Sequence, residues 1–320
     1  MKIIRYTSQM KNQWDTFIKG SKNGTFLFMR DYMDYHSNRF DDCSFLFYEN
    51  DRLCAVLAGN LSKNEDQSLT FYTHQGLTYG GFILHKKSRA ELPLLLMEEL
   101  IKYLKNINVA LFYYKAIPHI YHKFPAEEDI YSLFINKFSL LSCNISTAVR
   151  INKNIDSSRL FRAPKRKEKN NLVIEQTNDA SLFWDIIVND RKERHNVSPV
   201  HTLKEIQLLK DRFPDNIFFH IVKKDDEIIA GSVIYFTEEV IHLQYAAATN
   251  FGKSLYATDI IYYESIFNFF PNAEWFDFGI SNENNGLYLN TGMTNHKEEF
   301  GASSVVYNTY FLSLDYDKIS

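Results

Sequence analysis

The sequence predicts an α/β protein in which a mixed β-sheet with helices on its faces is built twice along the chain. The chain has 320 residues, enough for two domains of about 150 residues each. Each half contains a series of alternating apolar segments, then a helical segment and a further apolar strand, an order that favours a mixed sheet covered by helices. Corresponding segments lie about 160 to 175 residues apart, as expected of a duplicated domain.

The first half contains this pattern once. Its most strongly periodic segment is 89–105, where the apolar side chains fall on one side of a helix, namely Leu92, Leu95, Leu96, Leu100, Tyr103 and Leu104. We predict helices near 8–19, 89–105 and 127–138, and strands near 44–49, 53–60, 69–78, 109–114 and 141–151.

The second half repeats the same order of elements. We predict helices near 179–190, 202–212, 254–270 and 295–300, and strands near 217–223, 228–236, 240–248, 275–280 and 304–314. Thr202 and Glu205 have the spacing of a capping box, which marks the start of the second of these helices. The repeat of helices and strands in matching positions is what indicates two domains of one fold.

A basic segment separates the halves. Residues 159–171 carry six basic side chains, one acidic side chain, a proline and two asparagines, a composition typical of a solvated linker. The same residues could instead hold a phosphorylated ligand or touch an anionic membrane surface. We therefore predict a first domain at 1–151, a basic linker at 152–171 and a second domain at 172–320.

Composition and missing motifs narrow the function. The net charge of −3 provides no global attraction to DNA or membranes. The N-terminus lacks the apolar core of a signal peptide, and the three cysteines lack the spacing of a metal site, so we expect a cytoplasmic protein without a bound metal. The sequence contains no P-loop, GxGxxG, nucleophile elbow or HExxH, which argues against kinases, Rossmann oxidoreductases, serine hydrolases and zinc proteases.

Four residues of the second half are candidates for catalysis. Asp277 alternates with Phe276 and Phe278 along its strand, so it points away from both rings. Glu283 follows in a polar loop, where it could remove a proton from an amine or lie on the surface. Lys297 could stabilise negative charge or be an exposed lysine. His242 lies in the apolar strand 240–248. It could act as a base or be a core histidine with a structural role.

Other residues are candidates for ligand binding. Gly252, Lys253 and Ser254 precede a predicted helix and could cradle a pyrophosphate, or form a turn with a serine N-cap. Gln244 is expected to share a strand face with His242, and Tyr245 to lie on the other face. We add residues from polar loops that could contact an acceptor substrate, namely Tyr121, His122, His195, His201 and Asn290.

The order of these residues resembles the C-terminal part of FemABX-like transferases, which have the GNAT fold. The resemblance rests on Asp277-Phe278-Gly279, Glu283, Asn290 and Lys297-Glu298-Glu299-Phe300-Gly301, and on the segments 115–131, 195–205 and 242–245. It implies two tandem GNAT-like domains, the fold of acyl-CoA N-acyltransferases. It also implies that acyl-CoA is a co-substrate. It also implies that Lys297, which matches a lysine of the family, lies near the reacting centre. The usual GNAT pyrophosphate loop is not intact at 249–254 or at 78–81.

The resemblance implies an N-acyltransferase that acts on an amine of an amino sugar or of a glycan or cell-envelope precursor. The acceptor would be a small molecule or a lipid- or nucleotide-linked glycan. One alternative is an aminoacyl-tRNA-dependent aminoacyltransferase that acts on a peptidoglycan precursor, the only case in which tRNA would be a partner. The non-enzymatic alternative is a degenerate GNAT pair that binds a glycan or a protein.

Overall fold

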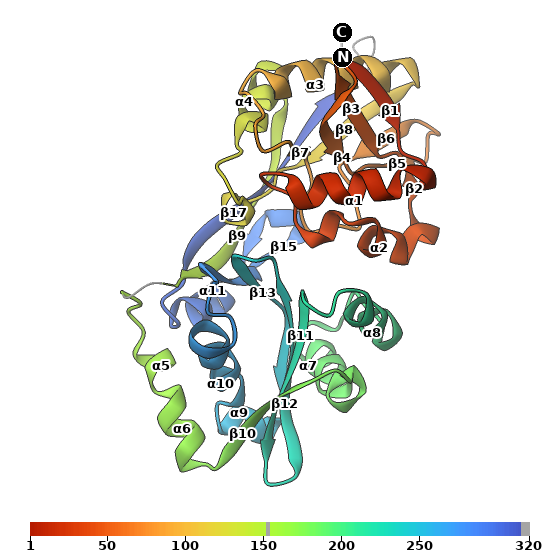
Figure 1. The fold of residues 1–320 in the computed structure, drawn as a ribbon. Coiled ribbons are helices and arrows are strands. Elements are labelled where there is room, and N and C mark those ends of the chain that lie inside the picture. Colours follow the sequence, from red (N-terminus) through yellow and green to blue (C-terminus); the bar gives the residue numbers. More distant parts are fainter. Residues whose placement is uncertain (152–153, 315–320) are drawn as a thin grey trace. The chain divides into compact units, whose positions relative to one another are not determined.

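The computed structural model describes residues 1–151 and 154–314, which form two compact units. Among the described residues, unit 1 contains 1–144, 285–287 and 306–314, and unit 2 contains 145–151, 154–284 and 288–305. Figure 1 shows both units as sheets flanked by helices. Within the described ranges, no helix is long and apolar enough to cross a membrane.

Unit 1 is built on two sheets. One sheet has the strand order β1-β3-β4-β7, and the strands of the other run β2-β5-β6-β8-β17 within this unit. The helices are α1 (Lys11–Gly20), α2 (Arg30–Met33), α3 (Leu92–Asn106) and α4 (Glu128–Ile135). The strands are β1 (Lys2–Arg5), β2 (Asp41–Asp42), β3 (Phe45–Glu49), β4 (Arg52–Leu57), β5 (Asn60–Lys63), β6 (Leu69–Tyr72), β7 (Phe82–Leu84), β8 (Val109–Lys115) and most of β17 (Ser303–Ser313).

Unit 2 has one large sheet and a short hairpin. The large sheet has the order β10-β11-β12-β13-β14-β9, and β15 pairs with β16. The helices are α5 (Ser158–Phe161), α6 (Ala163–Lys169), α7 (Trp184–His195), α8 (Leu203–Arg212), α9 (Asn250–Ser254), α10 (Ala257–Glu264) and α11 (Thr291–Glu298). The strands are the later part of β9 (Ser139–Arg150), β10 (Leu172–Thr177), β11 (Ile217–Lys224), β12 (Glu227–Phe236), β13 (Val240–Ala248), β14 (Trp275–Ile280), β15 (Asn282–Glu283) and β16 (Tyr288–Leu289).

The two units share one pattern of strand pairing at the end of a sheet, where each contains a strand from the other half of the chain. In unit 1, β6 pairs in parallel with β8, and β8 pairs with β17 in the antiparallel sense. In unit 2, β13 pairs in parallel with β14, and β14 pairs with β9 in the antiparallel sense. The middle of the chain thus completes the sheet of unit 2, and the C-terminal strand completes that of unit 1.

Each unit has its own apolar core. In unit 1, Leu92, Leu96, Leu100 and Leu104 are buried at every fourth position of α3, the spacing that puts them on one face of a helix. Leu95, predicted for the same face, is exposed. In unit 2, α5, α6 and α10 cover one face of the sheet, and α7 and α8 cover the other (Figure 1).

Several predicted elements are divided or shifted. The predicted strand 53–60 is divided into β4 and β5, which belong to different sheets. The predicted helix 254–270 is divided into α9, α10 and a π-helical turn, Ser265–Phe269. The predicted helices 179–190 and 295–300 lie at Trp184–His195 and Thr291–Glu298.

The predicted basic linker contains two helices of unit 2, α5 and α6. The carboxylate of Asp259 on α10 is buried and accepts hydrogen bonds from Arg159 (Nε, 2.9 Å, and Nη2, 2.9 Å) and from Arg166 (Nη1, 2.9 Å). Lys167 forms a further ion pair with Glu264 (2.7 Å). These contacts attach the segment to α10 along its length, so three of its six basic residues have acidic partners inside unit 2.

We predict that Asp259→Asn destabilises the protein by about 3 kcal/mol, because it leaves two arginines facing a neutral group at a buried position. The expected fall in the midpoint of thermal unfolding is roughly 6–12 °C. The matched control is Glu175→Gln, which breaks the exposed pair with Lys223 (2.6 Å) and should cost less than about 1 kcal/mol. Equal effects of the two substitutions would contradict the prediction.

Candidate active site

The candidate site lies where two parallel strands of unit 2 separate. β13 and β14 are paired over three rows, Val240↔Trp275, Ile241↔Phe276 and His242↔Asp277. Beyond His242, β13 continues to Ala248, but the described residues contain no further pairing with β14. A wedge therefore opens between the strands, and its inner end is the row that contains a histidine and an aspartate.

The side chains of this last row are hydrogen-bonded to each other. His242 Nδ1 lies 3.0 Å from Asp277 Oδ2. A carboxylate can only accept hydrogen bonds, so the Nδ1 nitrogen is the donor and the proton-accepting nitrogen of a neutral ring is Nε2. The pair has the geometry of a histidine oriented by a carboxylate.

Asp277 is completely buried and well satisfied. Its Oδ1 accepts hydrogen bonds from Ser146 Oγ (2.5 Å) on β9 and from the backbone N–H of Gly279 (2.9 Å). A buried carboxylate is costly unless it is hydrogen-bonded. Ser146, Gly279 and His242 provide these hydrogen bonds. Ser146 was not predicted from the sequence, since it lies 131 residues before its partner.

His242 retains access to the exterior of the unit. Its side chain is 14% exposed, whereas that of Asp277 is fully buried. Gly279 lies beside the ring, with a backbone φ of +79°, a conformation that favours glycine. A methyl group at Gly279 would lie 3.6 Å from His242 Cε1. That distance is an ordinary van der Waals contact, so the backbone conformation, rather than space beside the ring, favours glycine here.

Lys297 holds the loop that follows β14. Its ammonium group donates to Gly279 O (2.7 Å), Ile280 O (3.1 Å) and Ser281 Oγ (2.9 Å). The residue is only 8% exposed, and this burial lowers the pKa of Lys297 to about 8, although Asp277 acts in the opposite direction. These three acceptors match the three N–H donors of the ammonium, so Lys297 attaches the loop to α11.

Glu283 lies on the exposed hairpin beyond this loop. Its Oε1 accepts a hydrogen bond from Asn290 Nδ2 (2.8 Å). Asn290 Oδ1 in turn accepts from the N–H of Met293 and caps α11. The chain thus brings His242 and Asp277 into contact and joins Lys297 to them through the 279–281 loop, while Glu283 is tied to the start of α11.

A β-bulge changes the predicted face of Tyr245. In the pairing of β12 with β13, Ile234 lies opposite Leu243 and Val233 opposite Tyr245, so Gln244 is the extra residue. The predicted alternation of Gln244 and Tyr245 is therefore wrong, and Tyr245 lies on the same face as His242. Tyr245 is buried against Trp184 and its hydroxyl is 2.9 Å from His201 Nδ1.

The predicted pyrophosphate cradle is engaged within its own chain. Gly252 N donates to Thr249 Oγ1 (3.0 Å), which makes Thr249 the N-cap of α9 in place of the predicted serine. Lys253 forms an ion pair with Asp190 (2.8 Å), and Ser254 Oγ donates to Phe251 O. The three residues lie together on one short helix, but their polar groups have internal partners.

The remaining predicted binding residues are scattered. Tyr121 and His122 belong to unit 1, where the Tyr121 hydroxyl is 3.1 Å from that of Tyr307. Burial lowers the pKa of His122 to about 4. His195 ends α7, and its side chain lies outside the described residues.

Unit 1 carries different chemistry at the equivalent row. The last parallel row of β6 and β8 pairs Tyr72 with Tyr113, whose rings are stacked 4.9 Å apart. The His–Asp pair is therefore specific to unit 2. Among the described residues, no group of three or more histidine, cysteine or acidic side chains is placed to hold a metal ion.

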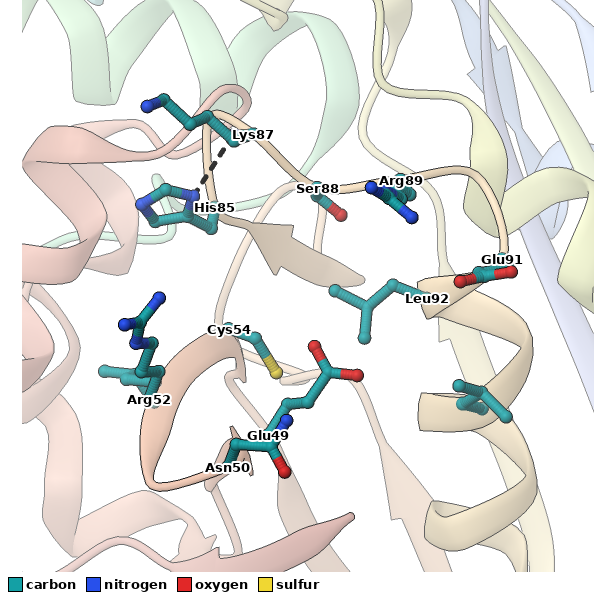
Figure 2. A pocket seen from close by; sticks show the side chains of 12 residues that line it. Glu49, Asn50, Arg52, Cys54, His85, Lys87, Ser88, Arg89, Glu91 and Leu92 are labelled. Carbon is teal, nitrogen blue, oxygen red and sulfur yellow. Dashed lines mark hydrogen bonds between the residues drawn. The ribbon is translucent and has the colours of Figure 1, made fainter.

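An open pocket of about 870 Å³ is found elsewhere, in unit 1 (Figure 2). Its lining mixes basic and acidic side chains, among them Arg52, Arg89 and Glu49, around Cys54. Burial raises the pKa of the Cys54 thiol to about 11, so this cysteine is not an activated nucleophile. None of the predicted site residues lines this pocket.

Solved structures share this architecture. FemX aligns with a TM-score of 0.72 at 12% identity, over 98% of this chain and 97% of that chain. L-PGS from Bacillus licheniformis aligns with a TM-score of 0.56 at 14% identity, over 96% and 93% of the two chains. A tandem GNAT protein from the clavulanic acid biosynthesis pathway aligns with a TM-score of 0.54 at 7% identity, over 99% of both chains.

No protein-family model matches the sequence, and no curated protein matches it. At these identities the structural likeness establishes the fold. The chain shares its fold with FemX and with a tandem GNAT protein, as the sequence resemblance predicted.

We predict that Lys297 makes stability depend on pH. Because burial lowers its folded pKa, the unfolded chain binds more protons between about pH 8 and 10, so the contribution of Lys297 to stability rises with pH there, by at most about 1.4 kcal/mol per pH unit. Urea unfolding of wild type and Lys297→Met would therefore diverge above pH 8. For the exposed control Lys19→Met, the free energy of unfolding should change with pH in parallel with that of wild type. A difference between wild type and Lys297→Met that stays constant with pH would contradict the lowered pKa of Lys297.

Proposed function

We propose that this chain, with the tandem GNAT architecture of FemX, is an N-acyltransferase whose reaction centre is the His242–Asp277 pair of unit 2. The observation that carries the proposal is the position of that pair. It occupies the last paired row of two separating parallel strands, and the ends of strands in α/β sheets are where ligands bind. The equivalent row of unit 1 holds two tyrosines, so we assign the chemistry to unit 2.

The reaction is the attack of an amine on an activated acyl group. The amine nitrogen bonds to the carbonyl carbon of a thioester or ester, and His242 Nε2 accepts the proton that the nitrogen loses. The tetrahedral intermediate then collapses, and the carbon–sulfur or carbon–oxygen bond breaks. The imidazolium returns its proton to the leaving thiolate or alkoxide, so the protein ends the cycle unchanged.

Asp277 and Lys297 act as positioning residues in this scheme. Asp277 orients the imidazole and stabilises its protonated form, as a buried carboxylate does in a catalytic triad. Lys297 fixes Gly279, Ile280 and Ser281 beside the ring. Because its three donors already bind the loop, we assign it to shaping the site rather than to direct contact with the oxyanion.

The wedge suits an extended donor. The edge of β13 that faces β14 presents backbone polar groups from Leu243 to Ala248 without a paired strand among the described residues. An acyl carrier with amide groups could hydrogen-bond to such an edge as an added strand does. A tandem GNAT neighbour is described as free of AcCoA, which indicates that AcCoA is a ligand of that protein, and on this basis an acyl-CoA is our first choice of donor.

One observation favours a second donor class. The polar groups of Gly252, Lys253 and Ser254 already have internal partners, so these residues do not offer a ready pyrophosphate cradle. An aminoacyl ester of tRNA would not need one at this position. The acceptor that we propose in either case is an amine of an amino sugar or cell-envelope precursor, with His201 and Tyr245 on the same side of the sheet as His242.

The donor can be identified directly. We expect the purified protein to transfer acyl groups to amino-sugar acceptors from either acetyl-CoA or aminoacyl-tRNA, and mass spectrometry of the acceptor distinguishes the two by the added mass. Acyl transfer from neither donor, with retained binding of a glycan or protein, would instead establish the degenerate GNAT pair as the function.

We predict that His242→Gln lowers kcat by about 10²- to 10⁴-fold, the usual contribution of a general base. The rise of the rate with pH in the wild type should disappear in this variant. Glu283→Gln is the matched control, because Glu283 is exposed and bound to Asn290, and its pH profile should follow that of wild type. A profile altered only in Glu283→Gln would move the base to Glu283.

A further inference from the structure

The helices α5 and α6 have an outer face that points away from α10. Successive residues of a helix are rotated by about 100°, which separates the side chains of this segment into two sets. Arg159, Arg166 and Lys167 point toward α10 and are paired with its acids. The opposite arc consists of Phe161, Arg162, Lys165, Glu168 and Lys169, all of them exposed. We call this arc the outer face.

The outer face carries a positive charge that unit 2 does not neutralise. Arg162, Lys165 and Lys169 form no ion pair with any residue in the described part of the chain. Glu168 is the one acid on the arc, so the surface keeps a net charge of about +2. The inward cations, by contrast, meet Asp259 and Glu264 and already serve to attach the helices. The outer cations are thus not required for that attachment.

Aromatic side chains are exposed beside these cations. Phe161 is 51% exposed and Phe267, from the π-helical turn after α10, is 36% exposed. Their rings lie 5.8 Å apart, and Tyr263 packs on Phe267 at 4.8 Å. An exposed aromatic cluster next to unpaired lysine and arginine is the combination that binds the interface of an anionic bilayer.

We propose that the outer face docks unit 2 on an anionic lipid surface, with the three cations at the headgroups and Phe161 at the boundary of the acyl chains. Charge complementarity favours an anionic lipid over an apolar protein partner, because the three cations lie on the same helical arc as the exposed Phe161. Phenylalanine adds affinity by burying apolar area in the bilayer. The proposal does not depend on the acyltransferase assignment, since none of these residues belongs to the reaction centre.

Vesicle sedimentation tests the proposal with the full chain. Wild type should bind vesicles of phosphatidylcholine with about 30% phosphatidylglycerol more strongly than phosphatidylcholine alone, and binding should fall as the salt concentration rises from about 0.1 M to about 1 M. The triple variant Arg162→Gln, Lys165→Gln, Lys169→Gln should lose on the order of 10²-fold in partitioning. Equal binding to both vesicles would overturn the proposal.

A control variant with three substitutions elsewhere distinguishes a specific binding surface from a general effect of the protein's net charge. Lys19→Gln, Lys63→Gln and Lys204→Gln remove three positive charges from exposed lysines elsewhere, and this variant should bind as wild type does. Equal loss in both triples would refute a specific surface. Circular dichroism and the midpoint of thermal unfolding verify that each variant is folded.

The aromatic contribution is tested by Phe161→Ser. We expect weaker vesicle binding that persists as a deficit at high salt, because apolar insertion is not screened. Bulk tRNA is the competing ligand in the same assay. If tRNA binds with the same dependence on the outer cations while anionic vesicles do not bind, the surface is a nucleic-acid site and the lipid proposal fails.

Discussion

The structure of unit 2 depends on the need to satisfy one buried carboxylate. Asp277 is fully enclosed, and its oxygens are bound by a hydroxyl from β9, a backbone N–H from its own loop and an imidazole from β13. Each donor fixes a different element, because a buried charge without its partners is costly. The row at which β13 and β14 separate, the conformation of Gly279 and the orientation of His242 therefore follow from one side chain. Lys297 completes the arrangement by holding the loop from the opposite side.

The matching strand pairs of the two units carry different residues at the same row. Both units contain a parallel pair of strands that ends in a facing row, and both cover it with a crossover helix. In unit 1 the row is closed by stacked tyrosines, which add apolar contact. In unit 2 the same position holds the hydrogen-bonded pair of His242 and Asp277. The strand pairing is equivalent in the two units, so the chemical difference between them at this position lies in the side chains of that row.

The sequence predicted the features that depend on local periodicity. The alternation of Phe276 and Phe278 with Asp277 gave the correct faces of β14, since both rings lie in the core of unit 2. The bulge at Gln244 was not predictable, because an extra residue in one strand is defined only by its partner strand. Ser146 and Asp259 were missed for a related reason. Their partners lie 131 and about 100 residues away, and a single sequence shows no pairing over such separations.

The exchange of final strands has a consequence for synthesis on the ribosome. β8 pairs with β17, so Leu111 finds its partner Ser313 only after some 200 further residues have been made. Until then one edge of β8 presents unpaired backbone groups, which in nascent chains invite association with other polypeptides. Unit 2 obtains β9 from earlier in the chain and can complete its sheet as soon as β14 emerges. The half made first is therefore the half that finishes folding last, and it is the one that would need protection by a chaperone.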